Sequence, residues 1–206
     1  MSQTQRVFVD ANVLYSRTLR DWLFLLRNET GSSFQVHSTE DVLVETLYRL
    51  RRDHPKWDGG HIFRLRKHLE LNLDELIADY DMSVAYNGAD PNDLHVHAAA
   101  IAGHADILLT ADEGFATLAE GDTLPYSVYC CDAFFVLLDD SGSRAVQRVV
   151  SFQQKYWAKK QDSDPAVKSL SEALAAAGCK KFALRVEGHL KTLSGPTPQT
   201  HPQGGH

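Results

Sequence analysis

The chain has 206 residues, of which 43% are hydrophobic and 23% are charged, and its formal net charge is −6. These values are typical of a globular protein and exclude wholesale disorder. No run approaches the roughly 20 apolar residues that a membrane-spanning helix needs, so we expect no membrane association. The first residues lack an apolar signal region and the three cysteines form no C-x-x-C pair. A cytoplasmic protein with reduced thiols is therefore expected.

The charge is distributed unevenly along the chain. Residues 1–140 carry 11 Lys and Arg against 23 Asp and Glu, whereas residues 141–206 carry 10 against 4. A protein that coats nucleic acid would be basic throughout, and this chain is not. The acidic body indicates either a metal site at which some acids converge or a plain solvated surface.

Short apolar runs alternate with helical spacing in the first two thirds of the chain. We expect strands at 7–9, 34–37, 107–110 and 127–130. Helices are expected at 18–28, from Ser38 to about Leu50, once or twice over 61–80, and at 93–103. Ser38 with Asp41 resembles a capping box, and Asp90 caps a helix whose first position is Pro91. This alternation predicts an α/β fold with a mainly parallel sheet.

The sequence changes character after about residue 140. Residues 141–192 show no strand pattern and predict three helices, with breaks near Asp164-Pro165 and Gly178. We divide the chain into an α/β domain at 1–138, an all-α extension at 139–193 and a tail at 194–206 that we expect to be disordered. In the 18–28 helix, Trp22, Phe24 and Leu25 place apolar residues on more than one face, which indicates a homodimer surface.

Two acids follow predicted strands directly. Asp10 comes after the 7–9 strand, and Asp112 follows the 107–110 strand within two residues. Sites in parallel sheets form outside the carboxyl ends of the strands. If these strands are near neighbours, both carboxylates face one crevice. The alternative for each is a turn residue or a helix cap.

Two further acids lie on predicted helices. Glu45 borders the apolar face of its helix, where a carboxylate is costly unless it is paired or bound to a metal. Its alternative is a solvated ion pair with Arg49, four residues on. Asp93 lies in the first turn after the Asp90 cap, where a favourable interaction with the helix dipole is the alternative.

Several carboxylates around one crevice raise each other's pKa unless a cation is present. Oxygen ligands favour Mg²⁺ or Mn²⁺ over zinc, and such an ion can polarise a phosphoryl oxygen and orient a water molecule. The residues therefore point to phosphodiester hydrolysis. His95 and His97 are two residues apart, so they face different sides of a helix and cannot chelate one ion together.

Four blocks of the sequence carry a family resemblance. Residues 7–14 (VFVDANVL) resemble the opening D-x-N-V-L motif of PIN-domain ribonucleases. Residues 38–45 resemble the segment with that family's second acid, and residues 90–100 and 105–112 resemble the segments with its third and fourth acids. The resemblance covers roughly residues 6–135. Thr18-Leu19-Arg20-Asp21 and the helical extension are similar to the VapC-type toxin branch of the family.

The resemblance implies a PIN-like three-layer sandwich followed by an all-α extension. It implies that Asp10, Glu45, Asp93 and Asp112 are catalytic and bind one or two Mg²⁺ or Mn²⁺ ions. Supporting roles beside them fall to Asn12, Asp90 and Thr110. Family members cut single-stranded RNA, and a cognate antitoxin inhibits the toxin branch. Leu94 departs from the pattern, because this branch often has Arg there.

The resulting hypothesis is a metal-dependent endoribonuclease acting on single-stranded or loop RNA, the toxin of a type II toxin–antitoxin pair. The alternative is a non-catalytic PIN-like subunit that binds RNA or acts as a scaffold. Two basic runs, 49–52 and 64–67, are open to two interpretations. They either bind RNA phosphates, with Trp57 nearby for stacking, or form a solvated face or an antitoxin surface.

Overall fold

The computed structural model describes residues 4–121, 124–164 and 166–193. Its centre is a sheet of five strands, all parallel, in the order β3-β2-β1-β4-β5. The strands are β1 (Gln5–Val9), β2 (Phe34–Ser38), β3 (Glu75–Leu76), β4 (Ile107–Leu109) and β5 (Ser127–Tyr129). The α/β prediction with a mainly parallel sheet is confirmed. The expectation for the tail at 194–206 lies outside the described residues.

Helices connect the strands and continue beyond the last one. The first half of the chain contains α1 (Ala11–Tyr15), α2 (Arg17–Glu29), the short η1 (Gly31–Ser33), α3 (Glu40–Asp53) and α4 (Gly59–Asn72). The second half contains η2 (Pro91–Asp93), α5 (Leu94–Ala102), α6 (Glu113–Ala119), α7 (Cys131–Ser163), α8 (Leu170–Ala176) and α9 (Lys180–Leu193).

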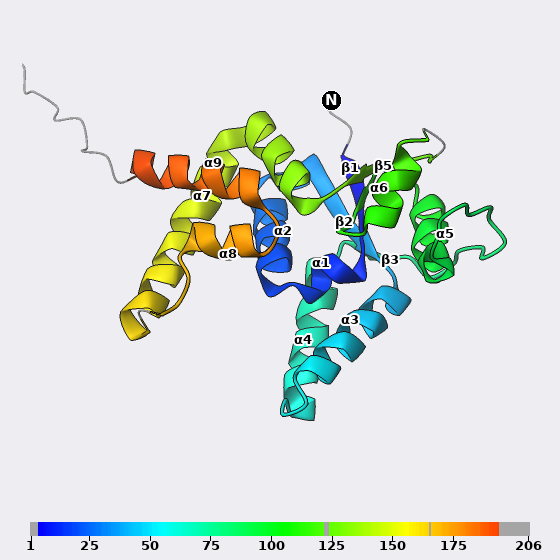
Figure 1. Cartoon of the computed structure of the whole chain (residues 1–206), viewed down its shortest axis with the longest axis horizontal. Helices are drawn as coiled ribbons and strands as arrows, with labels where there is room; N and C mark the ends of the chain where they lie inside the picture. Colours follow the sequence, from blue (N-terminus) through cyan, green and yellow to red (C-terminus); the bar gives the residue numbers. More distant parts are fainter. Residues whose placement is uncertain (1–3, 122–123, 165, 194–206) are drawn as a thin grey trace, which may run out of the picture.

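The strand order makes this a doubly wound sheet. The chain moves outward from β1 to β2 and β3, and then returns to β4 on the other side of β1 and on to β5. Because parallel crossovers are right-handed, this reversal places the two sets of helices on opposite faces. Figure 1 shows α5 and α6 on one side of the sheet, and α2 with the C-terminal helices on the other. The order reverses between β1 and β4, and the carboxyl ends of these neighbouring strands are where ligands bind in such sheets.

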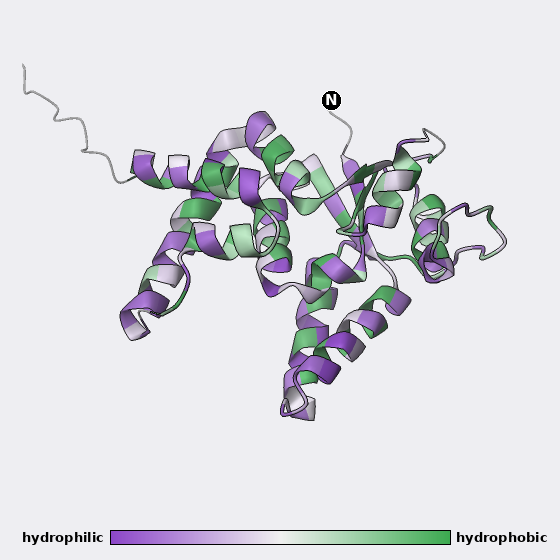
Figure 2. Cartoon of the chain, viewed as in Figure 1, coloured by the Kyte–Doolittle hydropathy of each residue, from purple (hydrophilic) through white to green (hydrophobic). Residues whose placement is uncertain are grey.

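The apolar runs that predicted the strands form the centre of the hydrophobic core. Val7, Phe8 and Val9 of β1 are fully buried, and Leu108 and Leu109 of β4 are as well. Strands covered on both faces read as continuous apolar runs, which is why β1 and β4 were predictable. Figure 2 shows hydrophobic residues within the sheet, whereas the outer helices alternate hydrophilic and hydrophobic residues.

Two local predictions were wrong. Residues 61–80 were expected to be helical, but α4 ends at Asn72 and the exposed pair Glu75–Leu76 adds β3 to the edge of the sheet beside β2. Ser38 was expected to cap the next helix, but it ends β2 and its hydroxyl donates to the Val9 carbonyl at 3.0 Å. Thr39 caps α3 instead, accepting from the Val42 amide at 3.2 Å. Ser38 and Thr39 both have side chains that can cap a helix, so the sequence alone does not distinguish which of the two is the cap.

The C-terminal helices pack onto α2. The predicted breaks near Asp164 and Gly178 are confirmed, and α7 is interrupted at Gly142 by a non-helical backbone (φ −156°, ψ 53°). The proposed boundary at residues 138 and 139 falls inside α7. None of the helices in the described part of the chain has the length and apolar character that a bilayer crossing would need.

Two of the three residues behind the homodimer expectation, Trp22 and Phe24, are buried within the chain, and the homodimer itself stays a prediction. The ring centroids of Trp22 on α2 and Phe182 on α9 are 5.1 Å apart, so α9 covers the face of α2 that carries Trp22. Phe182 also packs against Phe135 of α7, with ring centroids 5.2 Å apart. Trp22 and Phe24 are only 1% and 4% exposed. Burial within the same chain explains Trp22 and Phe24, whereas Leu25 is only partly buried.

Candidate metal centre

Asp10 is a buried carboxylate at the point where β1 becomes α1. It caps α1 by accepting from the Ala11 amide at 2.5 Å, and it also accepts from the Thr110 hydroxyl at 2.7 Å and the Asn12 amide at 2.6 Å. Burial raises the pKa of Asp10 above its ordinary value, and the hydrogen bonds from Thr110 and Ala11 oppose that rise. The side chain is therefore held in one orientation at the carboxyl edge of the sheet.

Thr110 connects the ends of β1 and β4. Its hydroxyl donates to Asp10 and accepts from the Asn12 side chain at 2.9 Å and from the Asp112 amide at 3.0 Å. The Asn12 side-chain oxygen completes the connection by accepting from the Ala111 amide at 2.9 Å. The structure thus places Asn12 and Thr110, both predicted as supporting residues, in contact with the first acid and the segment that carries the fourth.

Asp112 and Asp93 approach each other around the start of α6. Asp112 caps this helix by accepting from the Gly114 amide at 2.6 Å. A Cβ added to Gly114 would lie 2.8 Å from Asp112 Oδ1 and 4.0 Å from Asp93 Oδ2, so the two carboxylates lie on the same side of this backbone. The glycine leaves open the space that both oxygens border.

Asp93 carries the clearest electrostatic sign of a shared site. Its pKa is raised to about 6, first by burial and then by the charges of Asp112, Asp90 and Asp10. The Tyr86 hydroxyl donates to Asp93 Oδ2 at 3.5 Å, which opposes the rise. Repulsion among carboxylates of this kind is relieved either by protonation or by a cation.

Glu45 completes the set from a fourth segment. It lies on α3 with 41% of its side chain exposed, and Arg49 Nη1 is 3.6 Å from its Oε1. The pairing with Arg49, the alternative weighed for this residue, is therefore present, yet both side chains also line the acidic cleft. The cleft has a volume of about 540 Å³, and its lining is Asp10, Asn12, Glu45, Arg49, Asp90, Asn92, Asp93, His95, Val96 and Asp112.

The donor chemistry of the cleft fits a hard divalent cation. Five carboxylates and one guanidinium line it, and oxygen ligands of this kind suit Mg²⁺ or Mn²⁺. Within residues 4–121, 124–164 and 166–193, no three His, Cys, Asp or Glu side chains already stand close enough to hold an ion. Asp10 and Asp112 accept from backbone amides, and Glu45 pairs with Arg49.

The cleft is also lined by residues that the sequence analysis did not assign to the site. Arg49 and Asn92 line it, and His95 Nδ1 lies 2.6 Å from the Asn92 carbonyl, so this nitrogen donates its hydrogen. His95 Nε2 is buried and has no hydrogen-bond partner in the described part of the chain. His97 faces elsewhere, as its spacing predicted, with its Nδ1 2.6 Å from the Tyr126 hydroxyl. Arg49 follows Glu45 by four residues on a predicted helix, and this spacing was the sequence feature that indicated that the two side chains lie together.

A doubly wound parallel sheet with carboxylates gathered at its switch point defines an α/β protein with an acidic cleft lined by oxygen donors. A family model described as PIN domain matches residues 6–114, a little over half of the chain. The chain belongs to the PIN domain family, whose members are generally nucleases. Comparisons with curated proteins and with solved structures gave no significant match.

Proposed function

We propose that this PIN-domain protein is a metal-dependent endoribonuclease that hydrolyses phosphodiester bonds in single-stranded or loop RNA. The observation that supports it best is the convergence of Asp10, Glu45, Asp93 and Asp112, from four separate segments, on one cleft. A cleft with this many acids is electrostatically unfavourable without a cation, as the raised pKa of Asp93 indicates. A scaffolding subunit would gain nothing from such an arrangement.

In this proposal the four carboxylates hold Mg²⁺ or Mn²⁺. A divalent ion in such a site polarises the phosphoryl oxygen, activates a water molecule and stabilises the leaving oxygen. Asp10 is already fixed by Thr110 and Asn12, so it supplies a preoriented ligand. Glu45 supplies an adjustable one, because its position is limited only by the exposed pair with Arg49.

Arg49 would be available to the substrate if Glu45 held the cation in place of the guanidinium. Its guanidinium lies at the border of the cleft, 5.0 Å from the centroid of the Tyr15 ring. A guanidinium freed from its carboxylate partner is well suited to contact an RNA phosphate bidentately. Arg49 therefore orients the phosphodiester, while the carboxylates keep the reacting centre anionic enough to require the cation.

A Mn²⁺ titration followed by thermal unfolding tests the metal site. A ligand at one hundred times its Kd stabilises the native state by about 2.7 kcal/mol, which for a chain of this size raises Tm by roughly 5–10 °C. Asp10→Asn keeps a capping side chain of the same shape but removes the charge, so it should abolish this rise. The matched control is Asp79→Asn, an exposed carboxylate outside the cleft, which should respond as the wild type does.

Cleavage of single-stranded RNA separates the enzyme from the scaffold. The wild type with Mn²⁺ should cut, and Asp93→Asn should not, although its fold is intact by circular dichroism. Unchanged cutting by Asp93→Asn would leave that residue only its interaction with the helix dipole. Absence of both cutting and Mn²⁺ stabilisation in the wild type would favour the scaffolding subunit.

We also propose that the protein is the toxin of a VapC-type pair, restrained by a cognate antitoxin. The support is the order and spacing of the four acidic blocks together with the helical extension. Expression of the chain alone should arrest growth of the host cell, and co-expression of a small protein encoded in the adjacent reading frame should restore it. Growth unaffected by an active nuclease would contradict the toxin role without affecting the enzyme proposal.

A further inference from the structure

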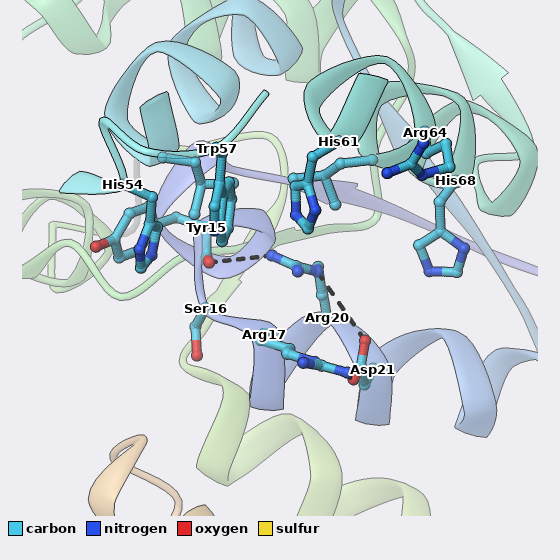
Figure 3. Close-up of a pocket in the computed structure, with 12 residues that line it drawn as sticks. Tyr15, Ser16, Arg17, Arg20, Asp21, His54, Trp57, His61, Arg64 and His68 are labelled. Atoms are coloured by element: carbon cyan, nitrogen blue, oxygen red, sulfur yellow. Dashed lines mark hydrogen bonds and ion pairs between the residues drawn. The ribbon is translucent and has the colours of Figure 1, made fainter. Parts of the chain in front are cut away.

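A second cavity lies between the start of α2 and the α3–α4 pair (Figure 3). Its volume is about 620 Å³, and none of its lining residues lines the acidic cleft. The lining combines three arginines and three histidines with Trp57 and Tyr15, against a single carboxylate, Asp21. In an otherwise acidic domain this is a local concentration of cationic and aromatic side chains.

Arg20 is the most unusual residue of this cavity. Its side chain is only 8% exposed, and the carboxylate nearest to its Nε is Asp21 Oδ1 at 4.0 Å. One of its terminal nitrogens donates to the Leu14 and Tyr15 carbonyls at 3.0 and 3.1 Å, while its buried Nε has no hydrogen-bond partner among the described residues. A buried guanidinium with unused donors is costly unless an anion completes its bonding.

The wall opposite Arg20 is a stack of three rings. His54 and Trp57 have centroids 4.1 Å apart with planes 12° apart, and Trp57 and His61 are also separated by 4.1 Å, with planes at 37°. Figure 3 shows Trp57 and His61 pointing from the α3–α4 side toward the Arg20 guanidinium. Flat aromatic surfaces beside cationic groups are what single-stranded nucleic acids bind, because every base offers a face to stack.

The cavity is close to the acidic cleft along the chain and in space. Asp10 immediately precedes the five-residue helix α1, and Tyr15 ends it, so the two sites lie at opposite ends of a helix about 7.5 Å long. Arg49 lines the cleft and its guanidinium is 5.0 Å from the ring of Tyr15, which lines the cavity. This pair forms the partition between the two sites.

We propose that this cavity is a nucleotide subsite, in which Arg20 and Arg64 bind an RNA phosphate and an outer face at the end of the His54–Trp57–His61 stack receives a neighbouring base of the same strand. The proposal rests on the proposed ribonuclease function and assigns the binding of substrate outside the scissile bond. The cleft would hold the reacting phosphate through its cation, and the subsite would fix the strand's position relative to it.

The surroundings favour an RNA strand over an acidic peptide. A peptide carboxylate would satisfy Arg20 but would leave the ring stack unused. A neighbouring cavity shares Arg17, Asp21 and His68 with this one and continues to Phe152 and Tyr156. Arg17 Nη2 donates to the Tyr156 hydroxyl at 3.2 Å, so a cationic and an aromatic side chain lie together in this neighbouring cavity. A combination of this kind suits a polymer of phosphates and bases.

Binding of a fluorescein-labelled single-stranded RNA, measured by anisotropy in EDTA, tests the subsite without any contribution from a metal ion. Arg64→Gln and His61→Ala should each weaken binding about three- to tenfold. Arg64→Gln should also lower the slope of log K against log salt by about 0.7, the value for one lost phosphate contact. The matched control is Lys67→Gln, which makes the same change of charge on α4 but lies outside the cavity. It should bind as the wild type does.

Two further measurements make the proposal refutable. An abasic oligonucleotide should bind wild type and His61→Ala equally, because the stack then has no base to receive. A poly-glutamate peptide that displaces the RNA with equal affinity per charge would instead assign the cavity to an acidic protein partner. Identical RNA binding by Arg64→Gln, His61→Ala and Lys67→Gln would also overturn the subsite. Arg20→Lys is a weaker test, because Arg20 also binds the carbonyls that end α1.

The two proposals fail separately. Arg64→Gln and His61→Ala should retain the full Mn²⁺-dependent rise in Tm, because neither residue lines the acidic cleft. Asp10→Asn should lose that rise and yet bind RNA in EDTA at least as well as the wild type. RNA binding that depends on the cavity, in a protein that never cleaves RNA, would refute the nuclease proposal and leave the binding site standing.

Discussion

Replacing Asp93 with asparagine should make the free protein more stable at neutral pH, even though it removes a proposed ligand. The folded protein raises the pKa of Asp93 from 3.8 to about 6, so the native state holds a proton at pH values where the unfolded chain has released it. Stability contributed by this group therefore falls as the pH rises from about 4 to about 6 and stays low above that range. The asparagine side chain carries no charge at any pH and avoids the repulsion.

The magnitude follows from the shift. About two pKa units correspond to roughly 3 kcal/mol for a fully buried group. Asp93 is partly exposed, and solvent screening reduces the expected contribution to about 1 kcal/mol. The cause lies first in burial and then in the charges of Asp112, Asp90 and Asp10, so the effect is confined to the metal-free cleft.

Urea unfolding in EDTA at several pH values between 4 and 8 measures this contribution. The difference in unfolding free energy between Asp93→Asn and wild type should grow by about 1 kcal/mol from the lower to the upper part of that range, in favour of the variant. Asp79→Asn, whose side chain is exposed outside the cleft, is the control. A difference between Asp93→Asn and wild type that is constant with pH would refute the idea of repulsion in the cleft.

Three other predictions concern the neighbours of the cleft and the extension. Thr110→Val removes a buried hydroxyl that donates to Asp10 and accepts from Asn12 and the backbone, so urea unfolding at pH 7 should show a loss of about 1–3 kcal/mol. Gly114→Ala places a Cβ 2.8 Å from Asp112 Oδ1, so calorimetry should show Mn²⁺ affinity reduced by about tenfold or more, with every carboxylate still present. Phe182→Ala leaves a cavity beneath α9 and should cost about 3–5 kcal/mol in a single cooperative transition; two separate transitions would contradict the shared core.

The central strands were predictable because their burial leaves a direct trace in the sequence. β1 and β4 are covered on both faces, so each reads as an uninterrupted apolar run followed by a polar residue at the edge of the sheet. β3 leaves no such trace. Both of its residues are exposed, and it is defined by its pairing with β2, a contact between segments distant in sequence. The local pattern of apolar and polar residues cannot predict a strand that is stabilised by pairing with a segment distant in the sequence.

The acidic cleft was partly predictable for the same reason. Asp10 and Asp112 follow recognisable strands, so their positions are consequences of the parallel sheet, and the pairing of β1 with β4 makes them neighbours. The orientation of Glu45 was not predictable, because a helical residue at the border of an apolar face can turn to solvent, to Arg49 or to the cleft. Family resemblance supplied that choice, and the structure shows Glu45 lining the cleft and paired with Arg49 at once.

The basic and aromatic cavity could not be predicted as a unit from the sequence. Arg20 belongs to α2, whereas Trp57 and His61 belong to the α3–α4 pair, and nothing in the intervening β2 segment signals that they meet. The sequence offered Trp57 and the 64–67 run as possible RNA contacts, but it gave no sign that Arg20 and His61 lie beside them. Their meeting depends on the packing of α1 against α3, which is a property of the folded chain.

The apolar core offsets the energetic cost of the acidic cleft. The cleft combines a buried Asp10 with an Asp93 whose pKa is raised, and both oppose folding in the absence of a cation. The opposing stabilisation comes from a core that runs from the sheet through Trp22 and Phe135 to Phe182 of α9. The helical extension therefore contributes apolar packing whose stabilisation offsets the cost of the clustered carboxylates. Weakening that packing should make the native fold more dependent on divalent cations, while the chemistry of the cleft is unchanged.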